Sequence, residues 1–450
     1  MRLVILRAKG GVGGSSVSLS LAKYYALIGK KVLLVDSDAI STASSAFGLK
    51  GLGLIQLAKR GESYEKAVTN VSIGKGSITV LKIMSDGVPV EYERMDLLTN
   101  KEKITKAYLQ ILERDNYDVT IVDTFPVVTP LEAIVGWEYS TYTSKFKEKS
   151  KYIMVSEPSK PSLEATERYY NILRENNHIA NGIDVAILNK VDVNILSYNE
   201  IFSILIDYMD RVNSNVGAVL PYEPRVARGL ENIVSVAVPV QLMEVGHYLL
   251  NPSKGRKVII PKPGDEIKTA ALLDATILLK ANIRVAEESI RDISNKYREV
   301  YPNSSIFLFT STGTTTQTTN VIVFRSIFTY LSERTKVKTL DDAIRIAKRL
   351  ALEIIDEVKK HKFEKNVLVF YPSDDIEPVS EYCDRALLAK TFWNELLLQL
   401  MFSLEKTSVI VVCNPMKANC SPLEDLVDFV IEATYGPEGM KYQLEYSKFY

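Results

Sequence analysis

Eight residues near the start of the chain, Lys9-Gly10-Gly11-Val12-Gly13-Gly14-Ser15-Ser16, have the composition of a loop that binds phosphate. A short apolar run precedes them and a helical pattern follows, so the loop is expected to join a strand to a helix. Backbone N–H groups of such a loop turn inward, and the helix N-terminus adds its positive end. A side chain at Gly10, Gly11 or Gly13 would crowd this nest. The pattern therefore predicts a site for nucleotide phosphates.

Polar side chains stand at the ends of later apolar runs. Asp36 and Asp38 end KKVLLVDSD, Asp123 lies in VTIVDT and Asn189 lies in DVAILNK. Buried parallel strands read as near-continuous apolar runs, and they end at one edge of the sheet. We therefore expect these side chains to lie near the glycine loop.

The elements that must position these residues follow an alternating pattern. Apolar runs predict strands at 78–83, 119–124, 152–157, 184–190 and 216–223. Amphipathic stretches predict helices at 101–115, 162–176 and 198–212 and a helical run over 226–250. We predict an α/β fold of two P-loop-NTPase-like domains, each a mainly parallel sheet covered by helices.

The second half repeats the rhythm after a stretch rich in Pro, Gly and Lys at 251–266, which predicts a boundary between domains 1–252 and 253–450. We expect helices at 267–299, 340–360 and 386–405, strands at 305–310, 366–371 and 408–414, and a hairpin at 426–449. Three cysteines lack a C-x-x-C spacing, which favours thiols over a metal or redox site.

The ordered series of motifs in residues 1–250 resembles the ParA/MinD family of partition and positioning ATPases. The glycine loop resembles the deviant Walker A motif of that family, and the stretch with Asp36 and Asp38 resembles its Walker A′ strand and switch I. YDVTIVDTFP resembles the Walker B strand, with Asp123 as its acid. AILNKVD resembles the strand whose Asn, here Asn189, contacts the base.

The segment that begins LPYEP resembles the late Pro-Tyr/Phe-Asp-Pro segment beside the base and contributes Pro221. The resemblance thus implies ATP and Mg²⁺ as ligands. The residues expected to bind the nucleotide are Gly10, Gly11, Val12, Gly13, Gly14, Ser15, Ser16, Asn189 and Pro221.

The resemblance also implies roles in metal binding and catalysis. Ser15 would be a direct Mg²⁺ ligand, and Asp36 and Asp123 would hold the metal's waters. Asp38 would orient the attacking water or accept its proton. Family members dimerise face to face over two ATP molecules, so Lys9 would reach the phosphates held by the partner copy, like an arginine finger in trans.

Gly14 departs from the family pattern, because the usual P-loop has lysine there. The loss removes a charge-assisted contact to the β- and γ-phosphates and should impair hydrolysis more than binding. Two interpretations remain open. Either the chain binds ATP and hydrolyses it slowly or only when paired, or it is a pseudo-ATPase that serves as a non-enzymatic adaptor.

The second half resembles RecA/RadA-type recombinase cores more faintly, through residues 381–416 and the terminal hairpin. Lys268-Thr269 would lie at a Walker A position that lacks its glycine, and Tyr371 replaces the Walker B acid. This resemblance implies a degenerate RecA-like domain used for assembly or docking, and a recombinase-related DNA-handling role is a further alternative. The Thr-rich loop 311–320 and the basic residues Lys254, Arg256, Lys257 and Lys262 could contact DNA or be simply solvated.

Bulk properties narrow the partners. Lys and Arg balance Asp and Glu at 55 each, so no whole-protein attraction to nucleic acid or membrane is expected. No run of 18 apolar residues predicts a transmembrane helix. The chain ends in an alternating YQLEYSKFY instead of an amphipathic helix, which disfavours membrane tethering. We expect a cytoplasmic homodimer with a DNA or protein partner.

Overall fold

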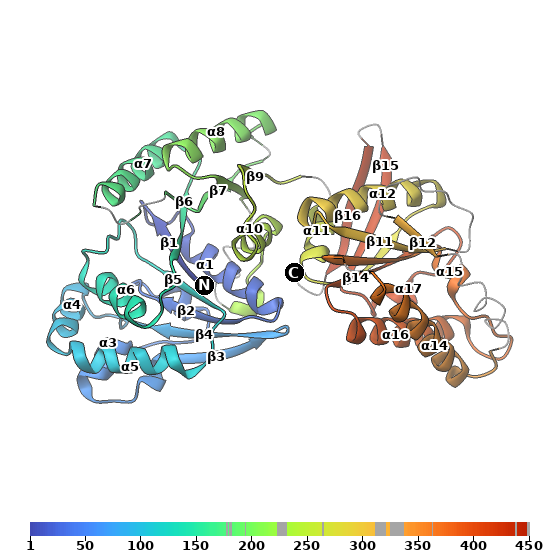
Figure 1. The fold of residues 1–450 in the computed structure, drawn as a ribbon, viewed down its shortest axis with the longest axis horizontal. Helices are drawn as coiled ribbons and strands as arrows, with labels where there is room; N and C mark the ends of the chain where they lie inside the picture. Colours follow the sequence, from blue (N-terminus) through green and yellow to red (C-terminus); the bar gives the residue numbers. More distant parts are fainter. Residues whose placement is uncertain are drawn as a thin grey trace. The chain divides into compact units, whose positions relative to one another are not determined.

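The computed structural model divides into two compact units, Met1–Pro261 and Lys262–Tyr450. It describes residues 1–176, 179, 182–193, 195–222, 232–262, 265–310, 321–324, 337–361, 363–436 and 439–447. The first unit extends past the predicted boundary at residue 252 because β9 (Lys257–Ile259) pairs with β8 (Val216–Pro221). Both units are α/β and contain a mainly parallel sheet with helices packed on it, which confirms the predicted fold class (Figure 1).

The described residues of the first unit form a sheet in the order β3-β4-β2-β5-β1-β6-β7-β8-β9. Adjacent strands are parallel except β3 and β4, which form a hairpin. The remaining strands are β1 (Arg2–Arg7), β2 (Lys31–Asp36), β3 (Val68–Ile73), β4 (Gly76–Lys82), β5 (Val119–Asp123), β6 (Ser150–Ser156) and β7 (Val185–Val191).

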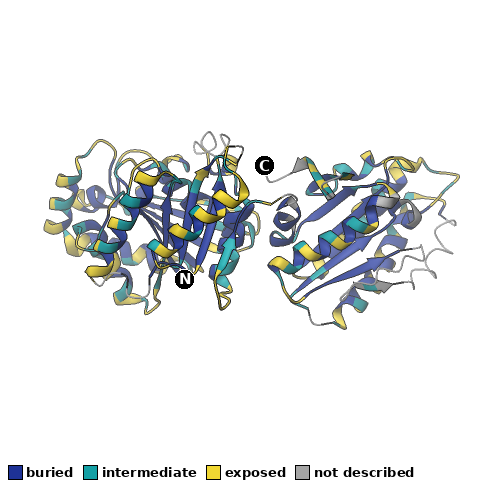
Figure 2. Ribbon diagram, turned by 90° about the horizontal axis from the view of Figure 1, so that it is seen from above, coloured by how far each residue is buried: buried dark blue, intermediate teal, exposed yellow. Residues whose placement is uncertain are grey.

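Helices cover this sheet, and their buried faces meet strands that are buried on both sides (Figure 2). Helix α10 lies so close to α1 that a Cβ at Gly246 would lie 2.6 Å from the Tyr24 ring. The helices are α1 (Gly14–Leu27), α2 (Thr42–Ser45), α3 (Leu54–Arg60), α4 (Val90–Thr99), α5 (Lys101–Arg114), α6 (Ala133–Lys145), α7 (Lys160–Glu175), α8 (Tyr198–Arg211) and α10 (Val240–Leu250), with 3-10 turns η1 (Tyr64–Ala67) and η3 (Ile233–Ser235).

The helical run predicted over 226–250 is wrong for residues 232–239, which the structure describes and which do not form an α-helix. Residues 223–231 lie outside the described residues, and α10 starts only at Val240. Pro239 precedes it with an extended backbone, φ −57° and ψ 139°. Proline also disfavours the helical region for the residue before it, so a helix cannot easily run through this point.

The second unit has a sheet in the order β12-β11-β13-β14-β10-β15-β16 among its described residues, with only β15 and β16 antiparallel. That pair confirms the predicted terminal hairpin. The strands are β10 (Thr276–Lys280), β11 (Ser304–Phe309), β12 (Val321–Phe324), β13 (Lys365–Phe370), β14 (Thr407–Cys413), β15 (Phe429–Gly436) and β16 (Gly439–Ser447). The helices are α11 (Asp265–Leu272), α12 (Ile283–Val300), α14 (Leu340–Lys359), α15 (Ser373–Ile376), α16 (Arg385–Ser403) and α17 (Ser421–Glu424).

The single helix predicted over 267–299 is wrong, because strand β10 divides it into α11 and α12. Asp274 adopts a left-handed φ of 52° before the strand. The strand then lies between β14 and β15, parallel to both. A strand buried on both faces has a continuous apolar run, which periodicity alone does not distinguish from a buried helix.

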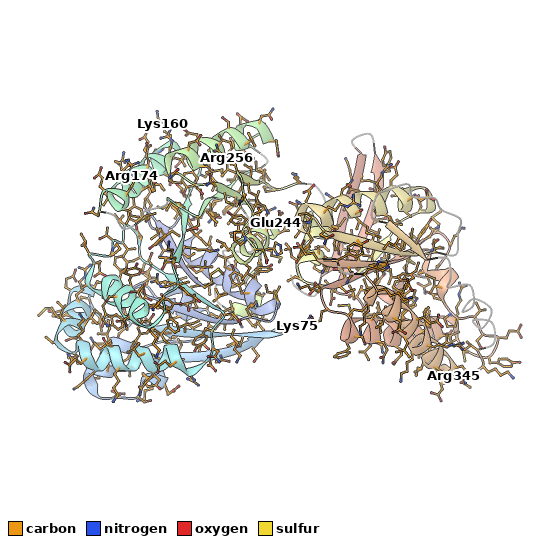
Figure 3. The ribbon with its side chains drawn as sticks, in the orientation of Figure 1. Lys75, Lys160, Arg174, Glu244, Arg256 and Arg345 are labelled. Atoms are coloured by element: carbon orange, nitrogen blue, oxygen red, sulfur yellow. A yellow bond between two sulfur atoms is a disulfide. The ribbon has the colours of Figure 1, made fainter. Side chains whose placement is uncertain are left out.

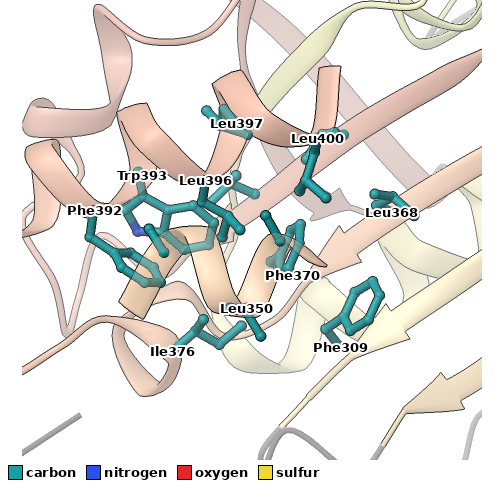
Figure 4. Packing of buried hydrophobic residues seen from close by; sticks show 14 of the residues in the cluster. Phe309, Leu350, Leu368, Phe370, Ile376, Phe392, Trp393, Leu396, Leu397 and Leu400 are labelled. Atoms are coloured by element: carbon teal, nitrogen blue, oxygen red, sulfur yellow. The ribbon is translucent and has the colours of Figure 1, made fainter. Parts of the chain in front are cut away.

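Aromatic side chains fill one core of the second unit, between the sheet and helices α14 and α16 (Figure 4). Phe370 stacks on Phe309 with ring centroids 4.9 Å apart, and Trp393 meets Phe370 edge-on. The indole N–H of Trp393 donates to Glu377 Oε1 at 2.9 Å, so this large side chain is buried with its polar atom satisfied.

Cys413 and Cys420 form a disulfide, so the expectation of thiols is wrong for these two residues. Cys413 ends β14, and the following turn returns Cys420 to a Cα–Cα distance of 6.0 Å. Cys383 is a free thiol. In the described part of the chain, no helix has the length and apolar character needed to cross a bilayer.

Candidate functional site

The glycine loop follows β1, which lies between β5 and β6 in the sheet. Parallel strands β2 and β5 end beside it, and Asp36 and Asp123 are register partners at their carboxyl ends. Ligands of open α/β sheets bind in the crevice at such carboxyl ends, where connections depart to either side. The sheet therefore brings the predicted acids to the edge that also carries the loop.

Glycine is required at two positions of the loop by backbone conformation. Gly11 has φ +81° and Gly13 has φ +93°, in the left-handed region that disfavours other residues. A Cβ on Gly13 would lie 2.2 Å from Asn189 Nδ2. Helix α1 begins directly afterwards at Gly14, so its unpaired N–H groups open toward the loop.

A cavity of about 360 Å³ lies over the loop. This volume is within the usual range for small-molecule sites. Asn189 comes from β7, and its Nδ2 donates to the Val12 carbonyl at 2.7 Å. The predicted residues that line the cavity are Gly10, Gly11, Gly13, Gly14, Ser15, Ser16, Asp38, Asn189 and Pro221. It is further lined by Arg7, Val17, Ser20, Ile40, Thr42, Pro126, Lys190, Leu220, Tyr222, Pro239 and Leu242.

The other predicted residues lie around this cavity without lining it. Val12 is buried. Lys9 is exposed, and its ammonium group makes no hydrogen bond or ion pair with the residues that the structure describes. Asp36 and Asp123 are fully buried. The structure thus separates the residues that face the cavity from two acids that lie beneath it.

Burial shapes the chemistry of both hidden acids. Asp36 Oδ2 accepts from the Ser44 N–H at 2.7 Å and its Oδ1 from the Asp38 N–H at 3.2 Å. Burial, aided by repulsion from Asp123, raises the pKa of Asp36. Burial also raises the pKa of Asp123, while the Arg7 guanidinium opposes that rise. Asp123 Oδ1 accepts from the Ser18 hydroxyl at 3.1 Å, and its Oδ2 has no hydrogen-bond partner among the described residues.

Arg7 is the principal site residue that the sequence interpretation missed. It ends β1, its side chain is nearly fully buried, and its Nη2 donates to Asp38 Oδ2 at 2.6 Å. Its Nη1 donates to Ser15 Oγ at 3.3 Å and lies 3.7 Å from Asp123 Oδ1. The available signal was a charged residue that follows the four apolar residues of β1, two residues before the loop.

The three residues predicted to hold Mg²⁺ do not fit it in this arrangement. Mg²⁺ needs near-octahedral oxygen ligands and usually keeps several waters. Both oxygens of Asp36 accept backbone N–H groups, and the guanidinium of Arg7 lies between Ser15 and Asp123. Among the described residues, no group of three or more His, Cys, Asp or Glu side chains is arranged to hold a metal ion.

Lys190 is a second residue that the sequence interpretation missed. It follows Asn189 in β7 with a left-handed φ of 58°. Its ammonium group donates to the Gly11 carbonyl and to Glu157 Oε1 at 3.0 Å. Lys190 therefore ties the strand to the loop and adds positive charge to one wall of the cavity.

The lysine of the Walker A position predicted in the second half is held in internal ion pairs. Lys268 lies on α11, is buried, and pairs with Glu299 at 2.7 Å and with Asp265 at 3.4 Å. Thr269 is also buried, and Tyr371 is buried after β13. This arrangement does not support the proposed Walker A position, because α11 precedes the sheet's strand β10 instead of following it.

The basic residues near the boundary are partly neutralised. Arg256 pairs with Asp210 of α8 at 2.9 Å and lies beside that helix in Figure 3. Lys257 lies over the Tyr248 ring, and Lys262 approaches Glu299 at 3.7 Å. The Thr-rich loop 311–320 lies outside the described residues. These contacts weaken the interpretation of this cluster as a DNA-binding surface.

Fold and site together define an α/β unit with a glycine-rich loop and a cavity at the carboxyl edge of its sheet, and comparison with known proteins indicates its class. Residues 2–135 match a protein-family model described as an AAA domain. The chain is 30% identical over 130 residues to the chromosome-partitioning ATPase Soj of Thermus thermophilus, a match that covers 29% of this chain and 48% of Soj. The matched segment thus spans about half the length of that relative.

Two solved structures are also similar to the chain. The MinC:MinD cell division protein complex of Aquifex aeolicus has 20% identity and a TM-score of 0.41 and covers 58% of this chain and 99% of that one. The septum site-determining protein MinD of Pyrococcus horikoshii, complexed with Mg-ADP, has 18% identity and a TM-score of 0.37 and covers 54% and 88%. The N-terminal segment of the chain is of the ParA/MinD ATPase type, which confirms the resemblance found in its motifs.

Proposed function

We propose that the chain is a ParA/MinD-like ATP-binding protein that dimerises on ATP. Hydrolysis is slow or depends on a partner, and the dimer positions or segregates DNA or a cellular assembly. The observation that carries this proposal is the cavity that the glycine loop lines together with Asn189 and Pro221. The proposed activity of the whole chain extends beyond the segment that its curated relatives cover.

The loop side of the cavity suits phosphates, and other lining residues offer surfaces for a base. Gly11 and Gly13 keep side chains away from the loop backbone, and α1 presents its N-terminus there. Asn189 supplies an amide beside the loop, and Pro221 and Tyr222 add flat surfaces to the cavity lining. The amide of Asn189 also holds the Val12 carbonyl, so one side chain would couple base binding to the loop's conformation.

Lys9 supports the face-to-face dimer. It stands exposed on the loop without an ion pair among the described residues, although ammonium groups elsewhere in the unit, such as Lys190 and Lys82, pair with acids. An exposed cation at the rim of a phosphate site is free to contact phosphates held by a second copy. This contact would supply in trans part of the charge that Gly14 cannot.

The proposal predicts that ATP raises the mass of the full chain from monomer to dimer in light scattering and that Lys9→Ala prevents it. Because each copy contributes one Lys9, the variant dimer loses two charge-assisted contacts, and dimerisation should weaken by about a hundredfold to ten-thousandfold. Lys75→Ala is the matched control, because Lys75 is exposed in the β3–β4 turn, at the amino end of β4 and away from the loop. A nucleotide-independent mass, or equal behaviour of both variants, contradicts the dimer.

A non-hydrolysing adaptor is the second candidate, and the Arg7–Asp38 ion pair favours it. Asp38 is the residue predicted to act on the attacking water, yet Arg7 and the Ile40 N–H engage its two oxygens. Both oxygens of the carboxylate thus already accept hydrogen bonds from the protein, and a water molecule would have to compete with these donors. Phosphate release by the full chain separates the candidates, since turnover that Lys9→Ala abolishes supports the ATPase and turnover no faster than that of ATP in buffer supports the adaptor.

A further inference from the structure

We propose that Arg7 supplies the positive charge that neutralises nucleotide phosphates in this cavity, so that the chain binds ATP without a divalent metal ion. The inference rests on the proposed ATP-binding function and concerns how the same cavity balances charge. It starts from the misfit between Mg²⁺ and the residues predicted to hold it.

The guanidinium of Arg7 lies among the residues where the metal was expected. Its nitrogens are 3.3 Å from Ser15 Oγ, 2.6 Å from Asp38 Oδ2 and 3.7 Å from Asp123 Oδ1. The side chain is 6% exposed, so the group is held inside the protein and not on its surface. Four side chains were expected to hold the metal or the attacking water. Three of them, Ser15, Asp38 and Asp123, already contact the guanidinium of Arg7.

The same guanidinium has unused donors at the cavity. A guanidinium carries five N–H groups, and the contacts above use at most three. Arg7 lines the cavity, but its Nε is buried, so the donor left for a ligand is an N–H of the Nη groups. Arginine is also always charged and matches phosphate oxygens in a planar, two-pronged geometry. Phosphate oxygens in the cavity would therefore find free donors on Arg7.

A metal ion would compete with this arrangement. Mg²⁺ bound to Ser15 would lie about 2.1 Å from the hydroxyl oxygen, next to a guanidinium nitrogen that is 3.3 Å from the same atom. Two cations that share one oxygen at this distance repel each other and leave little room for the metal's waters. A metal ion at Ser15 would therefore be repelled by the guanidinium of Arg7, which the ion pair with Asp38 holds in place.

Gly14 completes the argument, because its lack of a side chain makes room for Arg7. A Cβ at position 14 would lie 2.3 Å from Arg7 Nη1 and 2.9 Å from its Cδ. The position that usually holds the phosphate-binding lysine is therefore a glycine, and the Arg7 side chain occupies the space next to it. Arg7 thus places one positive charge beside the position where an ordinary P-loop has its lysine.

Calorimetric titration of the full wild-type chain with ATP, once in excess EDTA and once in excess Mg²⁺, tests the inference without any variant. We expect the Kd in EDTA to lie within about threefold of the Kd in Mg²⁺. Binding only in Mg²⁺ overturns the role of Arg7 and leaves the proposed function standing. Binding in neither condition overturns the proposed function and the inference with it.

Variants then assign the effect to the arginine. In EDTA, Arg7→Ala should weaken ATP binding by about tenfold to a hundredfold. Arg114→Ala, which removes an exposed arginine of the same unit, should not weaken it. Arg7→Ala combined with Gly14→Lys should restore an ordinary P-loop and make ATP binding tighter in Mg²⁺ than in EDTA. Unchanged binding by folded Arg7→Ala overturns the inference; if that variant does not fold, the wild-type comparison still decides.

Discussion

Each unit joins a central parallel strand to a helix, but the two connections differ in what they can hold. In the first unit, β1 leads to α1 through residues 8–13, which include three glycines. In the second unit, β10 leads to α12 through Ala281 and Asn282 alone. Both strands have parallel neighbours on either side. Similar local architecture therefore provides a phosphate loop in one unit and a tight turn in the other.

The tight turn of the second unit provides its own hydrogen-bond acceptor for the start of α12. Asn282 Oδ1 accepts from the Val285 N–H at 3.0 Å, so the first turn of α12 is capped by its own chain. In the first unit, Gly13 precedes α1 without a side-chain cap, which leaves the helix N-terminus available to an anion. The difference teaches that the glycine loop together with the uncapped helix start, and not the strand–helix pair itself, distinguishes the candidate ligand site.

The largest expected effect comes from filling the loop of the first unit. Gly13→Ala puts a Cβ at φ +93° and 2.2 Å from Asn189 Nδ2. Strain of about 1–3 kcal/mol should appear as about tenfold to a hundredfold weaker ATP binding in calorimetry. Gly87→Ala is the control, because Gly87 has φ +73° but no atom within 4 Å of the added Cβ. Equal ATP affinities of the two variants would show that the loop does not bind the nucleotide.

A smaller effect, on stability alone, is expected at the lysine once assigned to a second phosphate loop. Lys268→Ala leaves Asp265 and Glu299 without their buried cation. Because Glu299 is partly exposed, the free energy of unfolding in urea should fall by about 1–3 kcal/mol, less than for a fully buried pair.

ATP affinity should not change in Lys268→Ala if the second unit has no phosphate site. Lys348→Ala provides the control, since its ammonium group is exposed and lies 3.7 Å from Glu395. A loss of ATP binding in Lys268→Ala, with stability intact, would break the contrast between the two connections.

The smallest effect is expected at the capped turn. Asn282→Ala removes the acceptor for the Val285 N–H and should lower the free energy of unfolding by about 1 kcal/mol. The same change at Asn295, exposed within α12, should cost nothing because alanine favours the helix interior. If Asn282→Ala lowers ATP affinity and leaves stability intact, the turn holds a ligand and the contrast fails.

Local patterns predicted most of the first unit because each signal is short-range. The glycines predict a loop, and acids at the ends of apolar runs predict the carboxyl edge of the sheet. Arg7 was missed because its role depends on side chains from three other segments, which carry Ser15, Asp38 and Asp123. No single stretch of sequence encodes that convergence.

The errors in the second unit have a different physical origin. Strand β10 was predicted as part of a helix, because Ile277, Leu278 and Leu279 form an unbroken apolar run between helix-forming stretches. Only the neighbours β14 and β15 decide that this run is extended. The Walker A position predicted at Lys268-Thr269 was wrong for the same reason. A Walker A loop follows the first strand of its sheet, and the sequence pattern did not show that β10 is that strand. The RecA-like class of this unit stays a prediction.

The close approach of Arg7 to Gly14 has a consequence for descent. With a Cβ at position 14 only 2.3 Å from the guanidinium, a lineage cannot keep lysine at 14 and hold arginine at 7 in this conformation. A lysine at position 14 would require the Arg7 guanidinium to adopt another rotamer. Relatives that retain lysine at the position of Gly14 should therefore carry a smaller or differently oriented side chain at the position of Arg7, and the two sites should covary.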